Sequence, residues 1–183
     1  LDRRQRQMCI RDRGKHEYYL IRKNWDKLWI VDPLDGTKEF VKRNGEFTVN
    51  IALVENGKPV IGIIYVPVKK WLYYGSSVGA FKKVNGLIQK LPICEDRNHL
   101  VVVGSRSHLS TETSDYFDSL KKKHGEIEIV SMGSSLKICL VAEGKADLYP
   151  RFAPTMEWDT AAGHAILNSV GKKLIDFKTK RHC

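Results

Sequence analysis

The chain has 183 residues, of which 42% are hydrophobic and 28% are charged. This balance is typical of a globular protein with one sizeable core, and no apolar run approaches the roughly 20 residues that a membrane-spanning helix requires. The formal net charge of +10 favours anionic partners, such as nucleic acid, an acidic membrane surface or a small phosphorylated molecule.

The first half of the chain is rich in strand patterns. Strands are predicted where β-branched and aromatic residues run together, at 28–31, 47–54, 60–66, 71–74, 80–81 and 87–91. Asn56-Gly57 stands between the second and third of these runs and is typical of a tight antiparallel hairpin. We therefore predict a mostly antiparallel sheet over residues 14–95.

Strands and helices alternate in the second half. Strands are predicted at 100–103, 127–130, 146–149 and 173–175, and helices at 110–123, 134–143 and 160–170. The change indicates a layered α/β protein with two sub-regions of one domain, 14–95 and 96–183. Residues 1–13 show no clear periodicity, and we predict that they are a foreign or disordered segment.

Two carboxylates follow the first apolar strand within one short motif, Asp32-Pro33-Leu34-Asp35. Pro33 is expected to start a turn that brings Asp32 and Asp35 to the same side and exposes the Leu34 carbonyl. Two acids held together favour a cation between them, and hard divalent ions such as Mg²⁺ prefer oxygen ligands. The motif therefore predicts a divalent-cation site.

The residues around this motif suit a phosphate group. Gly36 lets the backbone approach an anion closely, and the amides of Gly36 and Thr37 are expected to donate to phosphate oxygens. A third acid, Asp159, stands at the start of a helix whose small residues, Ala161 to Gly163, allow tight packing. Asp35 alone is explained equally well by an Asx turn, but the motifs together indicate metal-assisted phosphate chemistry.

The two motifs, in this order, resemble the signatures of the inositol monophosphatase superfamily, whose members are Mg²⁺-dependent, lithium-sensitive phosphomonoesterases. The resemblance extends from Gly14 to Phe177 and implies a layered αβαβα sandwich. Within the superfamily, the chain is most similar to the bacterial 3′(2′),5′-bisphosphate nucleotidases of sulfate assimilation, which convert adenosine 3′,5′-bisphosphate to AMP and phosphate. Segments 38–50, 105–108, 133–137 and 149–152 carry this similarity.

The resemblance implies a role for each matching residue. The expected ligands of two or three Mg²⁺ ions are Asp32, the Leu34 carbonyl, Asp35 and Asp159, and the expected catalytic residues are Asp32, Asp35 and Thr37, with Thr37 orienting the attacking water. The expected substrate-binding residues are Leu34, Asp35, Gly36, Thr37, Ser107, His108, Ser134, Ser135, Lys137, Arg151 and Asp159. Lys137 and Arg151 are expected to bind a second phosphate.

One part of the family pattern is missing. Family members carry a Glu-Glu pair upstream of the first motif, at the positions of Arg11-Asp12-Arg13 here, where Asp12 is the only carboxylate. We expect the chain to be truncated at both ends and to have weak activity or none, whereas the full-length protein is active.

Two other functions stay open. An inositol or sugar phosphate phosphatase on the same scaffold would need no second cationic pocket at Lys137 and Arg151. A nucleic-acid-binding module is a distant alternative, although five arginines and two aspartates give residues 1–13 a charge of +3 out of +10. We expect a cytoplasmic protein that binds a nucleotide bisphosphate and no nucleic acid, with peripheral attachment to the cytoplasmic face of the inner membrane and the oligomeric state left open.

Overall fold

The strands of the first half form one sheet in their order along the chain. The structure is a computed structural model, and it describes residues 8–9, 20, 22, 24–93, 97–104, 110–177 and 179. The strands of the large sheet are β1 (Met8–Cys9), β2 (Lys27–Asp35), β3 (Thr48–Glu55), β4 (Lys58–Val66), β5 (Trp71–Ser76), β6 (Gly79–Val84) and β7 (Leu87–Leu91). β1 runs parallel to β2, and each later neighbouring pair is antiparallel.

The hairpin between β3 and β4 is confirmed. Glu55 pairs with Lys58, so the loop consists of Asn56 and Gly57 alone, with φ angles of 48° and 74°. Two positive φ angles are what a tight hairpin turn of the favoured twist requires, and Asn-Gly supplies them at low cost.

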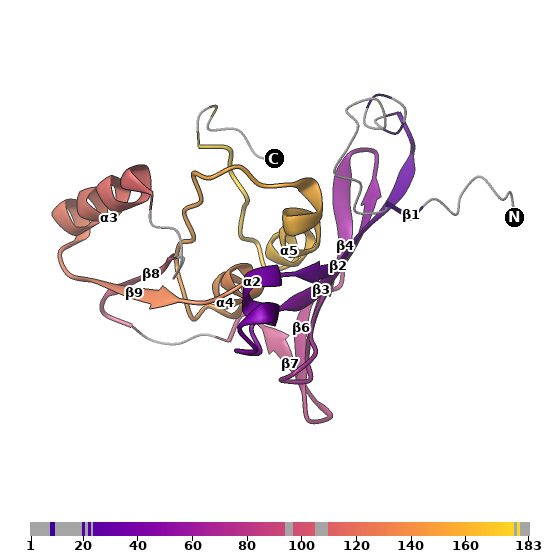
Figure 1. The fold of residues 1–183 in the computed structure, drawn as a ribbon, viewed down its shortest axis with the longest axis horizontal. Coiled ribbons are helices and arrows are strands. Elements are labelled where there is room, and N and C mark those ends of the chain that lie inside the picture. Colours follow the sequence, from indigo (N-terminus) through magenta and orange to yellow (C-terminus); the bar gives the residue numbers. More distant parts are fainter. Residues whose placement is uncertain are drawn as a thin grey trace, which may run out of the picture.

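Helices and a second sheet lie on one side of the large sheet (Figure 1). The remaining elements are α2 (Thr37–Val41), β8 (Leu100–Gly104), α3 (Thr111–His124), β9 (Ile127–Ser131), α4 (Leu136–Glu143) and α5 (Glu157–Ser169). β8 and β9 form a parallel pair, and Phe117 and Leu120 of α3 pack on Val102 and Ile127. The described chain is thus a layered mixed α/β protein, as predicted.

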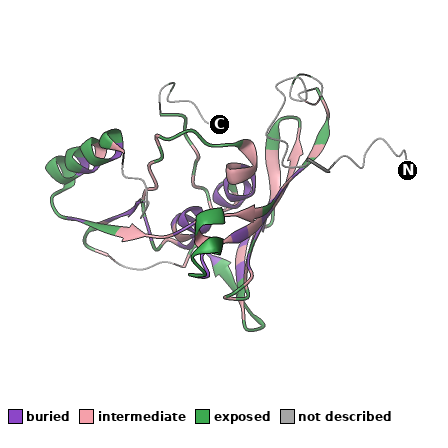
Figure 2. Cartoon of the chain, viewed as in Figure 1, coloured by how far each residue is buried: buried purple, intermediate pink, exposed green. Residues whose placement is uncertain are grey.

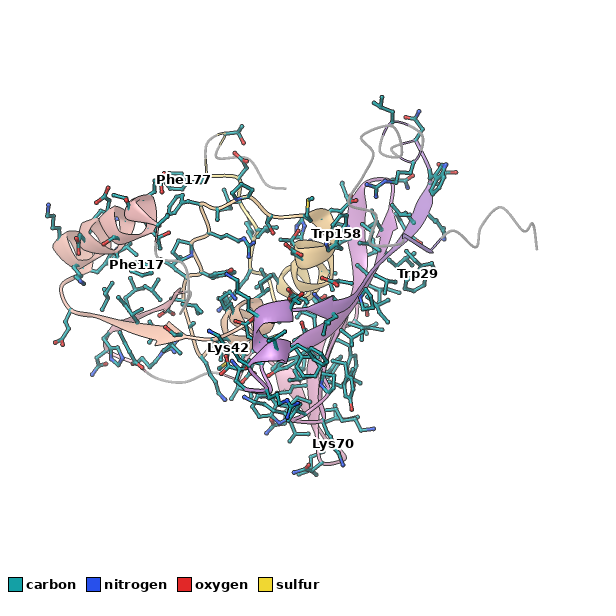
Figure 3. All side chains as sticks on the ribbon, in the orientation of Figure 1. Trp29, Lys42, Lys70, Phe117, Trp158 and Phe177 are labelled. Atoms are coloured by element: carbon teal, nitrogen blue, oxygen red, sulfur yellow. The ribbon has the colours of Figure 1, made fainter. Side chains whose placement is uncertain are left out.

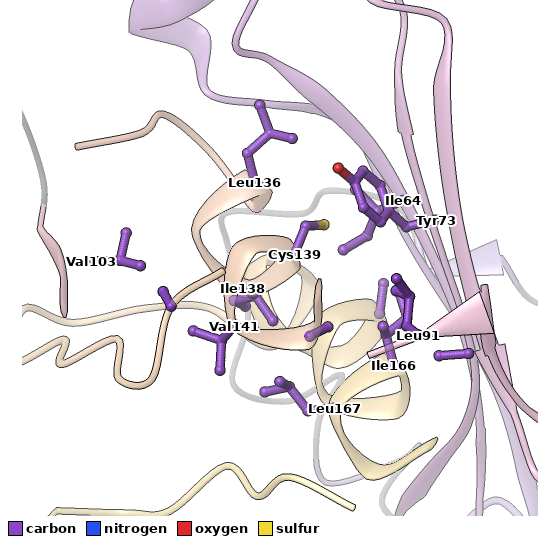
Figure 4. Close-up of a cluster of buried hydrophobic side chains, with 14 of the residues drawn as sticks. Ile64, Tyr73, Leu91, Val103, Leu136, Ile138, Cys139, Val141, Ile166 and Leu167 are labelled. Carbon is purple, nitrogen blue, oxygen red and sulfur yellow. The ribbon is translucent and has the colours of Figure 1, made fainter. Parts of the chain in front are cut away.

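The main core lies between the large sheet and the helices α4 and α5. Ile64 and Tyr73 of the sheet face Cys139 of α4 and Ile166 of α5 (Figure 4). Both helices are largely buried, whereas most of α3 is exposed (Figure 2). None of the helices in the described ranges is long and apolar enough to cross a bilayer.

Small residues set the close approach of α5 to its neighbours. A Cβ atom on Gly62 of β4 would lie 2.1 Å from the Ala162 carbonyl oxygen, and one on Gly163 would lie 2.7 Å from Ile138 Cγ2. These distances leave no room for a side chain. The expected tight packing of this small-residue helix is therefore confirmed.

Two predicted strands are wrong. Residues 146–149 make only an isolated parallel bridge, from Val102 to Leu148, and 173–175 are irregular apart from one bridge residue. Within residues 146–149, the Asp147 carboxylate accepts a hydrogen bond from the Val101 N–H at 2.8 Å, in the place of a backbone carbonyl. A side chain that occupies a ladder position stops a regular strand from forming there.

Candidate metal centre

A β-bulge brings the two acids of the first motif to one face of the sheet. Asp32 pairs with Asn50 and Asp35 with Thr48, so three steps along β2 match two along β3. The extra residue cancels the alternation that would otherwise point Asp32 and Asp35 in opposite directions. The strand therefore continues to Asp35, where a turn was predicted, and the exposed Pro33 lies within the irregular stretch.

The third acid belongs to the first turn of α5. This helix begins at Glu157, three residues earlier than predicted, and Asp159 is its third residue. Its Oδ2 accepts hydrogen bonds from Thr155 Oγ1 at 2.9 Å and from the Met156 N–H at 3.2 Å. The side chain that caps the helix is thereby fixed at the mouth of the site.

The three carboxylates converge, as the sequence predicted. One oxygen each from Asp32, Asp35 and Asp159 can be chosen so that all lie within 4.8 Å of one another. Asp32 is only 2% exposed, and its Oδ1 accepts the Leu34 N–H at 3.1 Å. Three negatively charged oxygens at this spacing fit a hard divalent cation such as Mg²⁺, and without a cation their repulsion would be unfavourable.

Hydrogen-bond donors surround Asp35 on its inner side. Its Oδ2 accepts from Ser134 Oγ at 2.5 Å, and from the N–H and Oγ of Ser135 at 2.7 Å each. Thr48 Oγ1 lies 3.3 Å and Asn50 Nδ2 3.5 Å from the same oxygen. The two serines that were predicted to bind substrate thus contact a predicted metal ligand.

A pocket of about 170 Å³ opens beside the carboxylates, with Lys137 and Arg151 on its wall. Lys137 is buried and donates to the Met132 carbonyl at 3.4 Å, while Arg151 Nη2 lies 3.8 Å from Asp159 Oδ2. Burial lowers the pKa of Lys137, and the Asp35 carboxylate opposes that shift. The pocket therefore combines a metal-binding side with a cationic side.

Two of the other predicted residues lie next to the pocket, and three lie outside the described part of the chain. Gly36 also lines the pocket and has a φ of 86°, a conformation that glycine adopts without strain, and Thr37 follows it as the first residue of α2. Ser107, His108 and Asp12 lie outside the described residues. The roles assigned to all of these residues stay predictions.

Sequence reasoning missed two polar residues next to the site, Thr48 and Asn50. They are 0% and 2% exposed and occupy inward-facing positions of β3. The strand pattern hides them, because Thr48 and Asn50 alternate with the larger apolar residues Val49, Ile51 and Leu53. On that pattern alone, the apolar residues would be assigned to the core. In the structure they lie on the outer face of the sheet. Trp29 of β2 lies on the same outer face, on the side of the sheet away from Trp158 (Figure 3).

The fold and the site together define a layered α/β protein with a carboxylate cluster for hard cations and an adjoining cationic pocket. A family model described as the inositol monophosphatase family matches residues 3–183. The chain belongs to the inositol monophosphatase family.

Known members of the family share both sequence and fold with the chain. The 3′(2′),5′-bisphosphate nucleotidase CysQ of Salmonella typhimurium is 53% identical over 160 residues, which cover 87% of this chain and 63% of the relative. The crystal structure of CysQ from Bacteroides thetaiotaomicron has a TM-score of 0.81 at 58% identity, over 87% of this chain and 65% of that one.

A more distant member has been solved with two different ligands. The structure of staphylococcal IMPase-II with inositol monophosphate has a TM-score of 0.64, and the match covers 79% of this chain and 55% of that one. The structure with 2′AMP has a TM-score of 0.67, and the match covers 82% of this chain and 57% of that one. Both are 28% identical to this chain. The chain spans slightly less than two thirds of the length of the Salmonella and Bacteroides CysQ proteins.

Proposed function

We propose that the protein is a Mg²⁺-dependent phosphomonoesterase that hydrolyses adenosine 3′,5′-bisphosphate to AMP and phosphate, in sulfate assimilation. The observation that carries the proposal is the convergence of Asp32, Asp35 and Asp159 beside a pocket with two cationic side chains. The CysQ relatives are named 3′(2′),5′-bisphosphate nucleotidases, which supports the choice of a nucleotide bisphosphate.

In this proposal the chain's own residues bind and orient the phosphate ester. The carboxylates of Asp32, Asp35 and Asp159, with the Leu34 carbonyl, would hold Mg²⁺, which when bound supplies an activated water and neutralises charge on the phosphate. Thr37 at the start of α2 orients the attacking water, and the amides of Gly36 and Thr37 donate to phosphate oxygens.

The second phosphate is assigned to the cationic side of the pocket. Lys137 and Arg151 supply the positive charge, and Arg151 is suited to a two-pronged contact with a phosphate. A larger cavity of about 770 Å³ shares Tyr149, Arg151 and Thr160 with the site pocket, and it offers space for a nucleoside. A monophosphate ester would leave the cationic side without an anion.

The alternative within the family is an inositol or sugar phosphate phosphatase. It is favoured by the staphylococcal relative, which was solved both with inositol monophosphate and with 2′AMP. The two proposals differ in whether a second phosphate on the substrate improves turnover.

A substrate comparison tests the proposal. Phosphate release is measured with Mg²⁺ from adenosine 3′,5′-bisphosphate and from inositol monophosphate. Two proteins are used: the 183-residue chain, and a hybrid in which the equivalent segment of the Salmonella relative replaces residues 1–13. We expect higher activity in the hybrid, because the family pattern places its Glu-Glu pair in that segment, and a higher kcat/KM for the nucleotide than for the inositol ester. Faster turnover of the inositol ester would contradict the proposal.

A Lys137→Met variant is expected to discriminate between the two substrates. Removing a buried charged donor to phosphate costs about 1.5–3 kcal/mol, which corresponds to a loss of roughly 10- to 100-fold in kcat/KM for the bisphosphate. The loss for inositol monophosphate is expected to be much smaller. Lys122→Met, on the exposed face of α3, is the matched control. Equal losses for both substrates would remove Lys137 from the proposed second-phosphate pocket.

A further inference from the structure

We propose that Thr48 and Asn50 are positioning residues of the metal centre. Through Ser134 and Ser135 they hold the Asp35 carboxylate with Oδ2 turned inward and Oδ1 turned toward the cations. This inference rests on the proposed function, because it assigns these four polar residues to the same metal-dependent site.

The contacts of Asp35 are one-sided. Within the described part of the chain, the hydrogen bonds to the Asp35 carboxylate all end on Oδ2, from the Ser134 hydroxyl, from the N–H and hydroxyl of Ser135 and, at longer range, from Asn50 Nδ2. Thr48 Oγ1 also lies 3.3 Å from this oxygen. An oxygen with this many donors has no lone pair to spare for a cation. Oδ1 is then the oxygen that joins the cluster with Asp32 and Asp159.

The proton of each hydroxyl group has a consistent direction. Asn50 Nδ2 donates to Ser135 Oγ at 2.9 Å, so the Ser135 proton points to Asp35 Oδ2 at 2.7 Å. Ser134 donates to the same oxygen at 2.5 Å, so Thr48 is the donor in its 2.6 Å contact with Ser134. The Asn50 amide is oriented by the same carboxylate, because its Nδ2 also lies 3.5 Å from Asp35 Oδ2, where only the NH₂ group of an amide can donate. Two relays from β3 therefore end on one carboxylate oxygen.

The two residues that begin these relays occupy positions in the buried face of β3, where an apolar side chain would be usual. Thr48 and Asn50 are buried, and they stand directly opposite Asp35 and Asp32 in the pairing of β3 with β2. Burying a hydroxyl or an amide is unfavourable unless it is hydrogen-bonded, and an apolar residue would pack there without that requirement. Their use beside both aspartates indicates that orientation of the acids is what they provide.

The backbone at Ser134 supports the same reading. Ser134 has a φ of 51°, in the left-handed region that residues other than glycine adopt at a cost. This conformation lets its Oγ contact both Oδ2 and the carbonyl oxygen of Asp35. Glycine would remove the strain, so a serine at this position retains its hydroxyl against a backbone preference.

Mn²⁺ binding to the 183-residue chain, followed by the EPR signal of free Mn²⁺, tests the inference without an activity assay. Loss of a group that orients a metal ligand typically weakens affinity by about 10- to 100-fold, and we expect this for Thr48→Val and Asn50→Ala. Thr48→Ser keeps the hydroxyl and is expected to bind like the parent. Val49→Ala, on the same strand but on the outer face, is the matched control for a change in stability alone.

A second variant keeps the test informative if the buried changes prevent folding. Ser134→Gly removes the hydroxyl and also relieves the strained φ, so it is expected to fold at least as stably as the parent and still to bind Mn²⁺ more weakly. Raising the Mn²⁺ concentration is expected to restore full occupancy in each folded variant, since the ligands themselves remain.

The possible results separate the two proposals. Parental Mn²⁺ affinity in Thr48→Val, Asn50→Ala and Ser134→Gly, together with lost binding in Asp35→Asn, would overturn the positioning role and leave the proposed function standing. Parental affinity in Asp35→Asn as well would overturn both, because Asp35 would then not be a ligand.

Discussion

Asp35→Asn is expected to lower the Mn²⁺ affinity of the chain by 100-fold or more and to reduce phosphate release by the hybrid protein to background. The substitution removes one of three converging negative charges, and even groups that only orient a metal ligand contribute about 10- to 100-fold to affinity. The fold is expected to persist, because an asparagine has nearly the same shape and its oxygen still accepts from Ser134 and Ser135. Free Mn²⁺ is measured by EPR, and released phosphate by a colorimetric assay.

The control for this prediction is an acid far from the site. Asp115 lies exposed on α3, and Asp115→Asn removes the same charge from the chain without touching the cluster. It is expected to leave both readouts unchanged. If Asp35→Asn and Asp115→Asn behaved alike, the effect would come from net charge and not from coordination.

Glu143→Gln is expected to destabilise the fold by about 3–5 kcal/mol, the range for breaking a buried ion pair by changing one partner. Glu143 is 1% exposed, and its Oε1 accepts from Lys82 Nζ at 2.8 Å and from the Tyr73 hydroxyl at 2.5 Å. Lys82, which also lies 4.2 Å from the centre of the Trp71 ring, would stay buried without its counter-charge. Urea unfolding measures the loss.

The same pair gives a dependence on pH. Burial raises the pKa of Glu143, but the hydrogen bonds from Lys82 and Tyr73 outweigh it, so the pKa lies below its ordinary value of 4.5. The carboxylate therefore contributes its stability above about pH 4.5, and that contribution is lost as the pH falls through the lowered pKa. The difference between the parent and Glu143→Gln should shrink on acidification.

The exposed ion pair between Asp118 and Lys121 provides the contrast. Both side chains are more than half exposed, so Asp118→Asn is expected to change stability by less than about 0.5 kcal/mol at any pH. A similar small effect for Glu143→Gln would mean that the buried cluster does not hold α4 against the sheet.

Much of the fold and the metal cluster could be predicted because their signals are local. Asn56-Gly57 demands positive φ angles at both positions, and such a turn determines the pairing of β3 with β4. Asp32 and Asp35 stand within one motif, and Asp159 stands as an isolated acid at the start of a small-residue helix, to which the resemblance assigned a ligand role. The expected side-by-side position of the first two acids was right, although a bulge and not a turn produces it.

The remaining features depend on partners that are distant in the sequence. Asn50 looks like an interruption of a strand until Ser135, 85 residues away, is placed against it. Lys82 and Glu143 are 61 residues apart, and neither is unusual on its own. The run at 146–149 has strand-like composition, but the Asp147 side chain takes the hydrogen bond that a ladder would need. Such features follow from packing, which no local pattern encodes.

The most direct test of the metal centre is anomalous X-ray scattering from crystals of the chain soaked in Mn²⁺. We expect at least one anomalous peak within about 2.1 Å of carboxylate oxygens of Asp32, Asp35 and Asp159, the distance typical of a small divalent ion. No peak at the cluster in fully soaked crystals, or a peak held only by other residues, would contradict the assignment of these three aspartates to a shared cation site.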